Sequence, residues 1–289
     1  KSWPLNYQEL KEYYKTAWNL VGEDGDKIID IYESNLNNRT QFNYKPFIMT
    51  DPKRLELPDY NKFSNVDLIR NANLVKILSK NRRSITGLKL FYQEKLLIKE
   101  IKDHQILVLA LGGIGNAQIL MQPNKENEDE ISIGNESGLV GKYLMEHPHV
   151  SYSGDIYYKE EILPKVKNLN IQPAFVLNDK YRSEKKLLNC SLSIENVKSE
   201  NKEEQEVFEK LIGSKLSHGN IYSRSEQEPL EINSFSLTNE KNWAGIHKLR
   251  IRHSFSALDL ISIEEHLKLF GEYLVSKNLG FVKIMNDEI

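Results

Sequence analysis

The chain is poor in cysteine, has no excess of either charge and contains no long apolar run. Its 289 residues include one cysteine, Cys190, which excludes an internal disulfide framework and a cysteine-based metal cluster. The 39 basic and 41 acidic residues give a net charge of −2, so the basic excess of a nucleic-acid-binding protein is missing. No apolar run approaches the roughly 20 residues of a membrane span. We therefore expect neither a nucleic-acid partner nor a membrane span, and the lone cysteine fits a cytoplasmic location.

The composition that remains is that of an ordinary globular protein. Hydrophobic residues make up 39% of the chain and charged residues 28%, and 289 residues suffice for a sizeable core. The sequence starts at Lys1 rather than at methionine and stops soon after an apparent strand. We expect it to be an interior piece of a longer polypeptide.

The most informative stretch runs from Gln105 to Leu120. Its first part is apolar without alternation up to Leu111, which predicts a strand buried on both faces. Gly112 and Gly113 then predict a tight turn, and the apolar spacing after them predicts a helix. Glycine lets backbone N–H groups at such a junction approach a phosphate or a flavin closely. An ordinary strand-to-helix turn explains the local pattern equally well.

Two consecutive motifs resemble the glucose–methanol–choline (GMC) flavoprotein oxidoreductases. Residues 108–120 are similar to the family segment V-L-A-x-G-G-I-x-N-A-x-x-L-L, and residues 138–148 to its G-L-V-G-R-Y-x-M-x-H-P run. A third segment, residues 226–237, resembles E-Q-x-P-x-x-x-N-R-V-x-L, with Ser234 in place of the arginine. The resemblance implies an FAD-dependent oxidoreductase that acts on the CH–OH group of an alcohol, polyol or sugar by hydride transfer to flavin.

The resemblance also implies site residues. Gly112, Gly113 and Asn116 would contact FAD at the glycine turn, and Leu74 takes the place of a valine whose backbone meets the adenine. A core role for Leu74 is an equally good interpretation. Arg224, Gln227 and His253 would project into a polar substrate pocket, although surface or sheet-packing roles are the simpler reading of each. The catalytic residues are unknown, because the family's N-terminal G-x-G-x-x-G and its C-terminal histidine are not in this sequence.

Three alternatives compete with this hypothesis. A nicotinamide-linked dehydrogenase fits poorly, because Gln118 stands where the dinucleotide fingerprint needs a small residue. His147 and His149 share a strand face and suggest a metal, but no carboxylate or cysteine constellation accompanies them, so we expect no metal site. A non-catalytic binding module derived from the same fold stays open. The oligomeric state, the substrate and the electron acceptor are not determined by the sequence.

The coarse pattern predicts an α/β chain, α+β overall. We expect residues 1–60 to be a helical connecting or lid segment, 61–145 part of a Rossmann-like FAD-binding domain with a β-meander, and 146–289 a substrate-binding domain of antiparallel sheet covered by helices. Helices are predicted over residues 3–20, 28–32, 199–216 and 257–276. Strands are predicted over residues 66–69, 74–78, 85–92, 95–99, 150–158, 174–177, 187–194 and 246–253.

Overall fold

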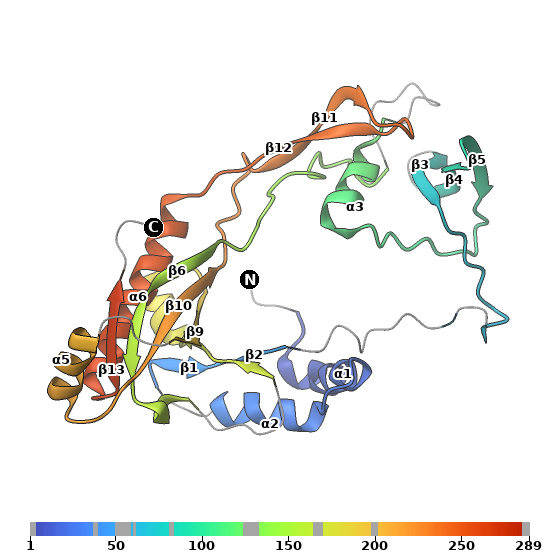
Figure 1. Ribbon diagram of the computed structural model, residues 1–289. Helices are drawn as coiled ribbons and strands as arrows, with labels where there is room; N and C mark the ends of the chain where they lie inside the picture. Colours follow the sequence, from blue (N-terminus) through green and yellow to red (C-terminus); the bar gives the residue numbers. More distant parts are fainter. Residues whose placement is uncertain are drawn as a thin grey trace. The chain divides into compact units, whose positions relative to one another are not determined.

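A computed structural model gives the fold as two compact units (Figure 1). It describes residues 4–36, 40–49, 59, 62–80, 84–123, 133–163, 170–197 and 202–284. Unit 1 comprises Lys1–Pro58, Glu146–Glu228 and Phe255–Ile289, and unit 2 comprises Asp59–Met145 and Pro229–Ser254. The chain is therefore discontinuous in both units, and each is described by itself.

Unit 1 is built on a six-stranded sheet in which every pairing is antiparallel. The order is β1-β8-β9-β10-β6-β13, so the long strands β6 and β10 lie side by side near the middle. The strands are β1 (Phe42–Tyr44), β6 (His149–Tyr158), β8 (Ala174–Leu177), β9 (Cys190–Asn196), β10 (Ser217–Ser225) and β13 (Gly280–Ile284). A separate two-stranded ribbon pairs β2 (Phe47–Ile48) with β7 (Ile171–Gln172).

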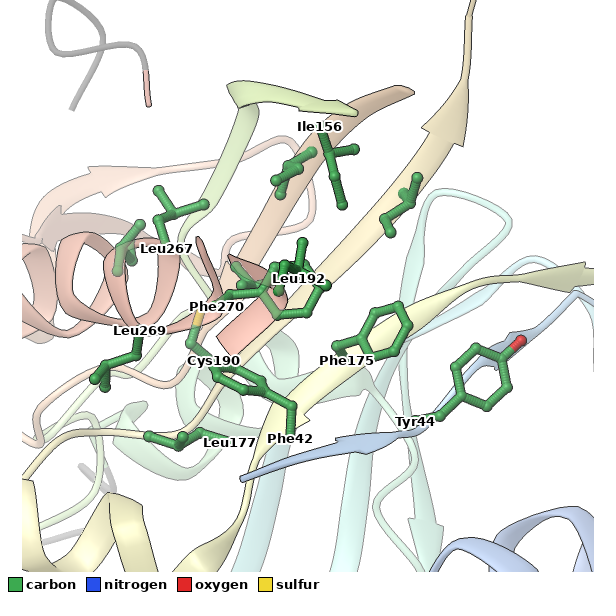
Figure 2. Packing of buried hydrophobic residues seen from close by; sticks show 14 of the residues in the cluster. Phe42, Tyr44, Ile156, Phe175, Leu177, Cys190, Leu192, Leu267, Leu269 and Phe270 are labelled. Atoms are coloured by element: carbon green, nitrogen blue, oxygen red, sulfur yellow. The ribbon is translucent and has the colours of Figure 1, made fainter. Parts of the chain in front are cut away.

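The core of unit 1 lies between one face of this sheet and helix α6 (Ala257–Ser276) (Figure 2). Alternation along the strands sends Ile156, Leu192 and Ile221 into the core, where each is fully buried. Phe270 of α6 meets Phe42 and Phe175, with ring centroids 5.0 and 5.1 Å apart. Removing this apolar surface from water is the main stabilising contribution to the unit.

Shorter helices complete unit 1. They are α1 (Tyr7–Leu20), α2 (Gly25–Leu36), the 3-10 turn η3 (Glu160–Ile162), α4 (Asp179–Lys185) and α5 (Lys202–Ile212). Helices α1 and α2 pack together and carry the ion pair between Lys11 and Glu33, 2.8 Å long. Phe208 of α5 stacks on Phe281 of β13, with ring centroids 4.6 Å apart.

Unit 2 contains a meander, a helix and a hairpin. The meander is β3 (Ala72–Lys80), β4 (Ser84–Tyr92) and β5 (Lys95–Glu100), all antiparallel. Helix α3 (Gly112–Met121) packs against β3 and against the hairpin of β11 (Ser234–Lys241) and β12 (His247–Arg252). Gln118 of α3 donates to the carbonyl of His247 at 2.8 Å, which ties the helix to the hairpin.

The predicted mixed fold, its meander and its antiparallel sheet covered by a helix are confirmed. Helix α6 has the predicted bounds. For the helix predicted over residues 199–216, the predicted start at Ser199 lies outside the described residues. Residues 66–69 form no strand, so that prediction is wrong. The Rossmann-like assignment of residues 61–145 stays a prediction.

The predicted buried strand before Gly112 is also wrong. Residues 105–110 have no regular secondary structure, and Ile106 and Val108 are 90% and 77% exposed. A strand that is apolar on both faces needs neighbouring strands for its backbone groups and a layer over each face. No strand of the described chain pairs with this segment.

Candidate polar face of the six-stranded sheet

The candidate site is the face of the six-stranded sheet that lies opposite α6. Along β10 the residues alternate strictly, with Gly219, Ile221 and Ser223 buried against the core. The intervening side chains point to the other face and are half-buried; they are His218, Asn220, Tyr222 and Arg224. This face therefore carries a row of polar and charged groups, whereas the α6 face is apolar.

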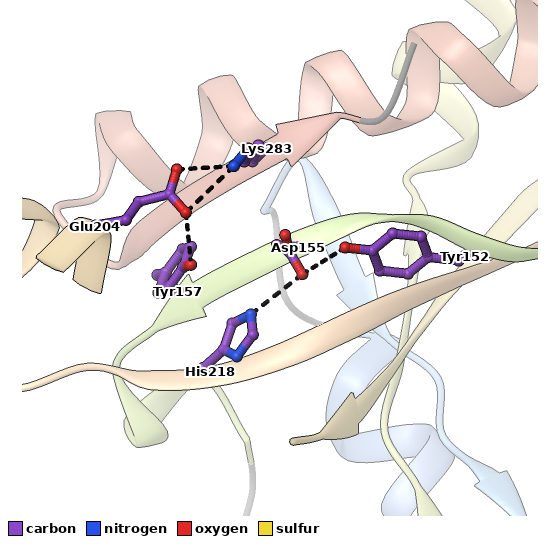
Figure 3. A network of polar contacts seen from close by, with 6 residues as sticks. All are labelled: Tyr152, Asp155, Tyr157, Glu204, His218 and Lys283. Carbon is purple, nitrogen blue, oxygen red and sulfur yellow. Dashed lines mark hydrogen bonds and ion pairs between the residues drawn. The ribbon is translucent and has the colours of Figure 1, made fainter. Parts of the chain in front are cut away.

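At one end of the row, Asp155 links two strands (Figure 3). Its Oδ1 accepts from Tyr152 Oη at 2.8 Å and lies 3.2 Å from His218 Nε2. The side chains of Asp155 and His218 are only 15% and 10% exposed, so the pair is shielded from water. His218 Nδ1 is buried and has no hydrogen-bond partner. A buried carboxylate–imidazole pair of this kind fixes the orientation of the ring.

Tyr157 connects this pair to a charged group on the neighbouring elements. Its ring stacks on His218, with centroids 4.7 Å apart, and its hydroxyl donates to Glu204 Oε2 at 3.0 Å. Glu204 of α5 also accepts from Lys283 Nζ of β13 at 2.9 Å. This hydrogen bond, which Lys283 donates, lowers the pKa of Glu204 and raises the pKa of Lys283. The network fastens α5 across the sheet and leaves this end of the face covered.

At the other end of the row, Arg224 and two imidazoles gather. Arg224 lies directly opposite His149 in the pairing of β10 with β6. Its Nη1 donates to Ser193 Oγ at 3.0 Å, and its guanidinium sits over the Phe47 ring, 4.8 Å from the centroid. His147 Nδ1 lies 2.7 Å from His149 Nε2, and both imidazoles are exposed. At this open end of the face, two exposed imidazoles lie beside the half-buried guanidinium.

The expected substrate residues lie in different places. Arg224 is on this open end, in unit 1. Gln227 is buried two residues after β10, and its Oε1 accepts from the Glu146 amide at 2.9 Å. Its side chain therefore links the segment that follows β10 to the segment that precedes β6. His253 is exposed and follows β12 in unit 2. The structure thus brings Arg224 and Gln227 into one unit and leaves His253 in the other.

The expected cofactor residues all lie in unit 2. Gly112 begins α3 with φ +75°, and a Cβ built at Gly112 or at Gly113 would meet nothing within 4 Å. Asn116 Oδ1 accepts from the Leu111 amide at 3.0 Å, which closes the turn from inside the helix. Leu74 is half-buried on β3, an edge strand of the meander. Helix α3 packs against β3, the strand that carries Leu74.

Other routes to chemistry receive no support from the described residues. Burial raises the pKa of Cys190 to about 12, so this thiol stays protonated and is a poor nucleophile. The described ranges contain no group of three or more metal-ligating side chains. None of their helices combines the length and apolar character needed to cross a membrane.

Sequence reasoning missed the Asp155–His218 pair. The two residues are 63 positions apart, and only the antiparallel register of β6 and β10 brings them together. No local motif marks either residue. The alternation of small or apolar residues with larger polar ones along β10 could have marked His218, but the sequence prediction contained no strand there.

Comparison with known proteins adds no assignment. No protein-family model matches the chain, and no curated protein matches it.

Proposed function

We propose that this chain belongs to an FAD-dependent oxidoreductase that oxidises a CH–OH group of a small alcohol, polyol or sugar. The observation that carries the proposal is the start of α3, where the residues that resemble the GMC glycine turn form an open helix N-terminus. Gly112 and Gly113 are exposed, and a Cβ built at either would meet nothing within 4 Å, so a ligand has room beside their backbone. A positive helix end with exposed N–H groups favours an anionic or electron-rich group such as a flavin or its phosphates.

The residues around this turn fit such a cofactor. Gly112 and Gly113 would hold it through their amides, and Asn116 would act indirectly by fixing the turn through the Leu111 amide. Leu74 would contribute its backbone, because β3 has only one strand neighbour in the described chain. FAD, when bound, supplies a two-electron acceptor for the hydride.

The substrate would lie on the polar face of the six-stranded sheet. Arg224 offers guanidinium N–H groups to a hydroxyl or carbonyl oxygen of the substrate, with Ser193 and Phe47 holding the guanidinium in place. Gln227 would act as a positioning residue, since its side chain bonds to the Glu146 amide just before β6. His253 lies in unit 2, so it receives no role in this site. We assign no catalytic base to the described residues.

A visible spectrum of the purified polypeptide that carries these residues tests the proposal. We expect flavin bands, with FAD released on denaturation. Gly112→Ala should lower FAD affinity at least about tenfold, because its methyl group would occupy the space in front of the amides.

Gly213→Ala is the matched control. Gly213 follows α5 with φ +76° and is equally open, so both variants carry the same backbone strain of about 1 kcal/mol. It should leave FAD affinity unchanged. A colourless protein that gains no bands on incubation with FAD would reject the oxidoreductase and favour a non-catalytic binding module.

A further inference from the structure

Arg224 is a half-buried cation without an anionic partner in the described chain. Among the described residues, its guanidinium donates one hydrogen bond, to the neutral hydroxyl of Ser193, and contacts one ring, that of Phe47. No described carboxylate forms an ion pair with it. Partial burial of an unneutralised charge is unfavourable, so such a cation is poised to bind an anion.

The guanidinium is already oriented for this role. Its Cζ lies over the Phe47 ring, 4.8 Å from the centroid, and its Nη1 donates to Ser193 Oγ at 3.0 Å, so two contacts hold the guanidinium in place. One N–H direction is used by Ser193, which leaves others in the same plane for an incoming acceptor. Two parallel N–H groups of a guanidinium match the two oxygens of a carboxylate.

The adjacent imidazoles set the charge of the site. His147 Nδ1 and His149 Nε2 are 2.7 Å apart, so one ring donates to the other. Partial desolvation, Arg224 and His147 all lower the pKa of His149. Arg224 therefore supplies a permanent positive charge, and the imidazoles supply hydrogen-bonding nitrogens beside it.

We propose that Arg224, with His147 and His149, binds the carboxylate of a small polyhydroxy acid on the open end of the sheet face. A single permanent cation matches a monoanionic carboxylate better than a dianionic phosphate. The proposal deepens the proposed function, on which it rests for the polyol part of the ligand. The three residues of the carboxylate site all belong to unit 1, so the site does not depend on the FAD site proposed in unit 2.

Calorimetric titration of the purified protein with three probes tests this site. Sodium gluconate carries both a polyol chain and a carboxylate, sorbitol carries the polyol alone, and inorganic phosphate is the competing oxyanion. We expect gluconate to bind at least about tenfold more tightly than sorbitol, which has no charge to pair with Arg224, and than phosphate, which has no polyol chain. Equal affinity for gluconate and sorbitol, or tighter binding of phosphate, overturns the proposal.

Variants locate the binding. Arg224→Gln should weaken gluconate at least about tenfold and sorbitol by less, because glutamine keeps N–H donors for a hydroxyl but has no charge for a carboxylate. Lys210→Gln removes the same charge from an exposed position on α5, away from the site, and should leave gluconate binding intact. If Arg224→Gln does not fold, Arg224→Lys and His149→Asn test the site: each should weaken gluconate relative to the unmodified protein, and unchanged gluconate binding in both overturns the proposal.

The two proposals fail separately. A colourless protein that still prefers gluconate keeps the carboxylate site and rejects the flavin. A yellow protein that does not distinguish gluconate from sorbitol keeps the oxidoreductase and rejects the carboxylate site.

Discussion

At the scale of single residues, the clearest pH-sensitive group is His266 in the core of unit 1. It is fully buried on α6, its Nδ1 lies 2.6 Å from the Ser262 carbonyl, and its Nε2 is buried without a hydrogen-bond partner. Nδ1–H therefore donates to Ser262, which fixes the tautomer. Burial lowers the pKa of His266 below its ordinary value of 6.5.

Substituting His266 should change how stability depends on pH. The unfolded chain takes up a proton near pH 6.5 and the folded chain only at lower pH, so the free energy of unfolding falls as pH drops below about 6.5. In His266→Leu this loss should be smaller between pH 8 and pH 5.5. Urea unfolding of both proteins across that range measures it, and parallel pH profiles would contradict the assignment.

At the scale of elements, two helices begin with the same capping box in different surroundings. In α6, Ser256 Oγ accepts from the Asp259 amide at 3.1 Å and Asp259 Oδ2 accepts from the Ser256 amide at 2.7 Å. Asp259 Oδ1 also accepts from the Glu228 amide at 2.6 Å, and the residue is fully buried. In α1, Asn6 and Glu9 form the same pair of bonds at the surface.

The buried cap should matter more than the exposed one. Asp259→Ala leaves the Ser256 and Glu228 amides without their acceptor, so we expect a loss of about 2 kcal/mol in the free energy of unfolding. Glu9→Ala, the matched change in α1, should cost about 0.5 kcal/mol because water replaces the lost bond. Urea unfolding of the two variants compares them, and equal costs would show that burial of the cap has no effect.

At the scale of the whole molecule, the hydrophobic cluster around α6 lies in unit 1. The apolar character of a segment does not by itself show whether that segment is buried. Leu267 of α6 is fully buried, whereas Val108 lies in the segment that the sequence marked as most apolar and is largely exposed. Both residues lie in apolar stretches whose pattern predicts burial. Leu267 is buried because the sheet packs against α6, whereas no strand of the described chain pairs with the segment of Val108.

Truncating these two residues tests where the core is. Leu267→Ala should lower the free energy of unfolding by about 3 kcal/mol, since it removes buried methyl groups and leaves a cavity. Val108→Ala should change it by less than about 0.5 kcal/mol, because the side chain is already in water. Unfolding followed by circular dichroism measures both, and a large cost at Val108 would contradict its exposure.

The sequence by itself determined the local elements of this protein. The capping residue Ser256 and the apolar period after it define α6, and runs of β-branched and apolar residues define the meander and most strands, because these signals act over a few residues. For Arg224 the sequence left open a substrate contact or a surface or sheet-packing role, and the structure places the residue on the polar face of the sheet.

Only the tertiary structure decided which residues meet. The pairing of β6 with β10 joins Asp155 to His218 and places His149 opposite Arg224, across sequence separations that no local pattern encodes. It also decided that Gln227 is a buried structural contact and that residues 105–110 form no strand. Burial depends on what packs over a segment, and that is a property of the assembled layers rather than of the segment.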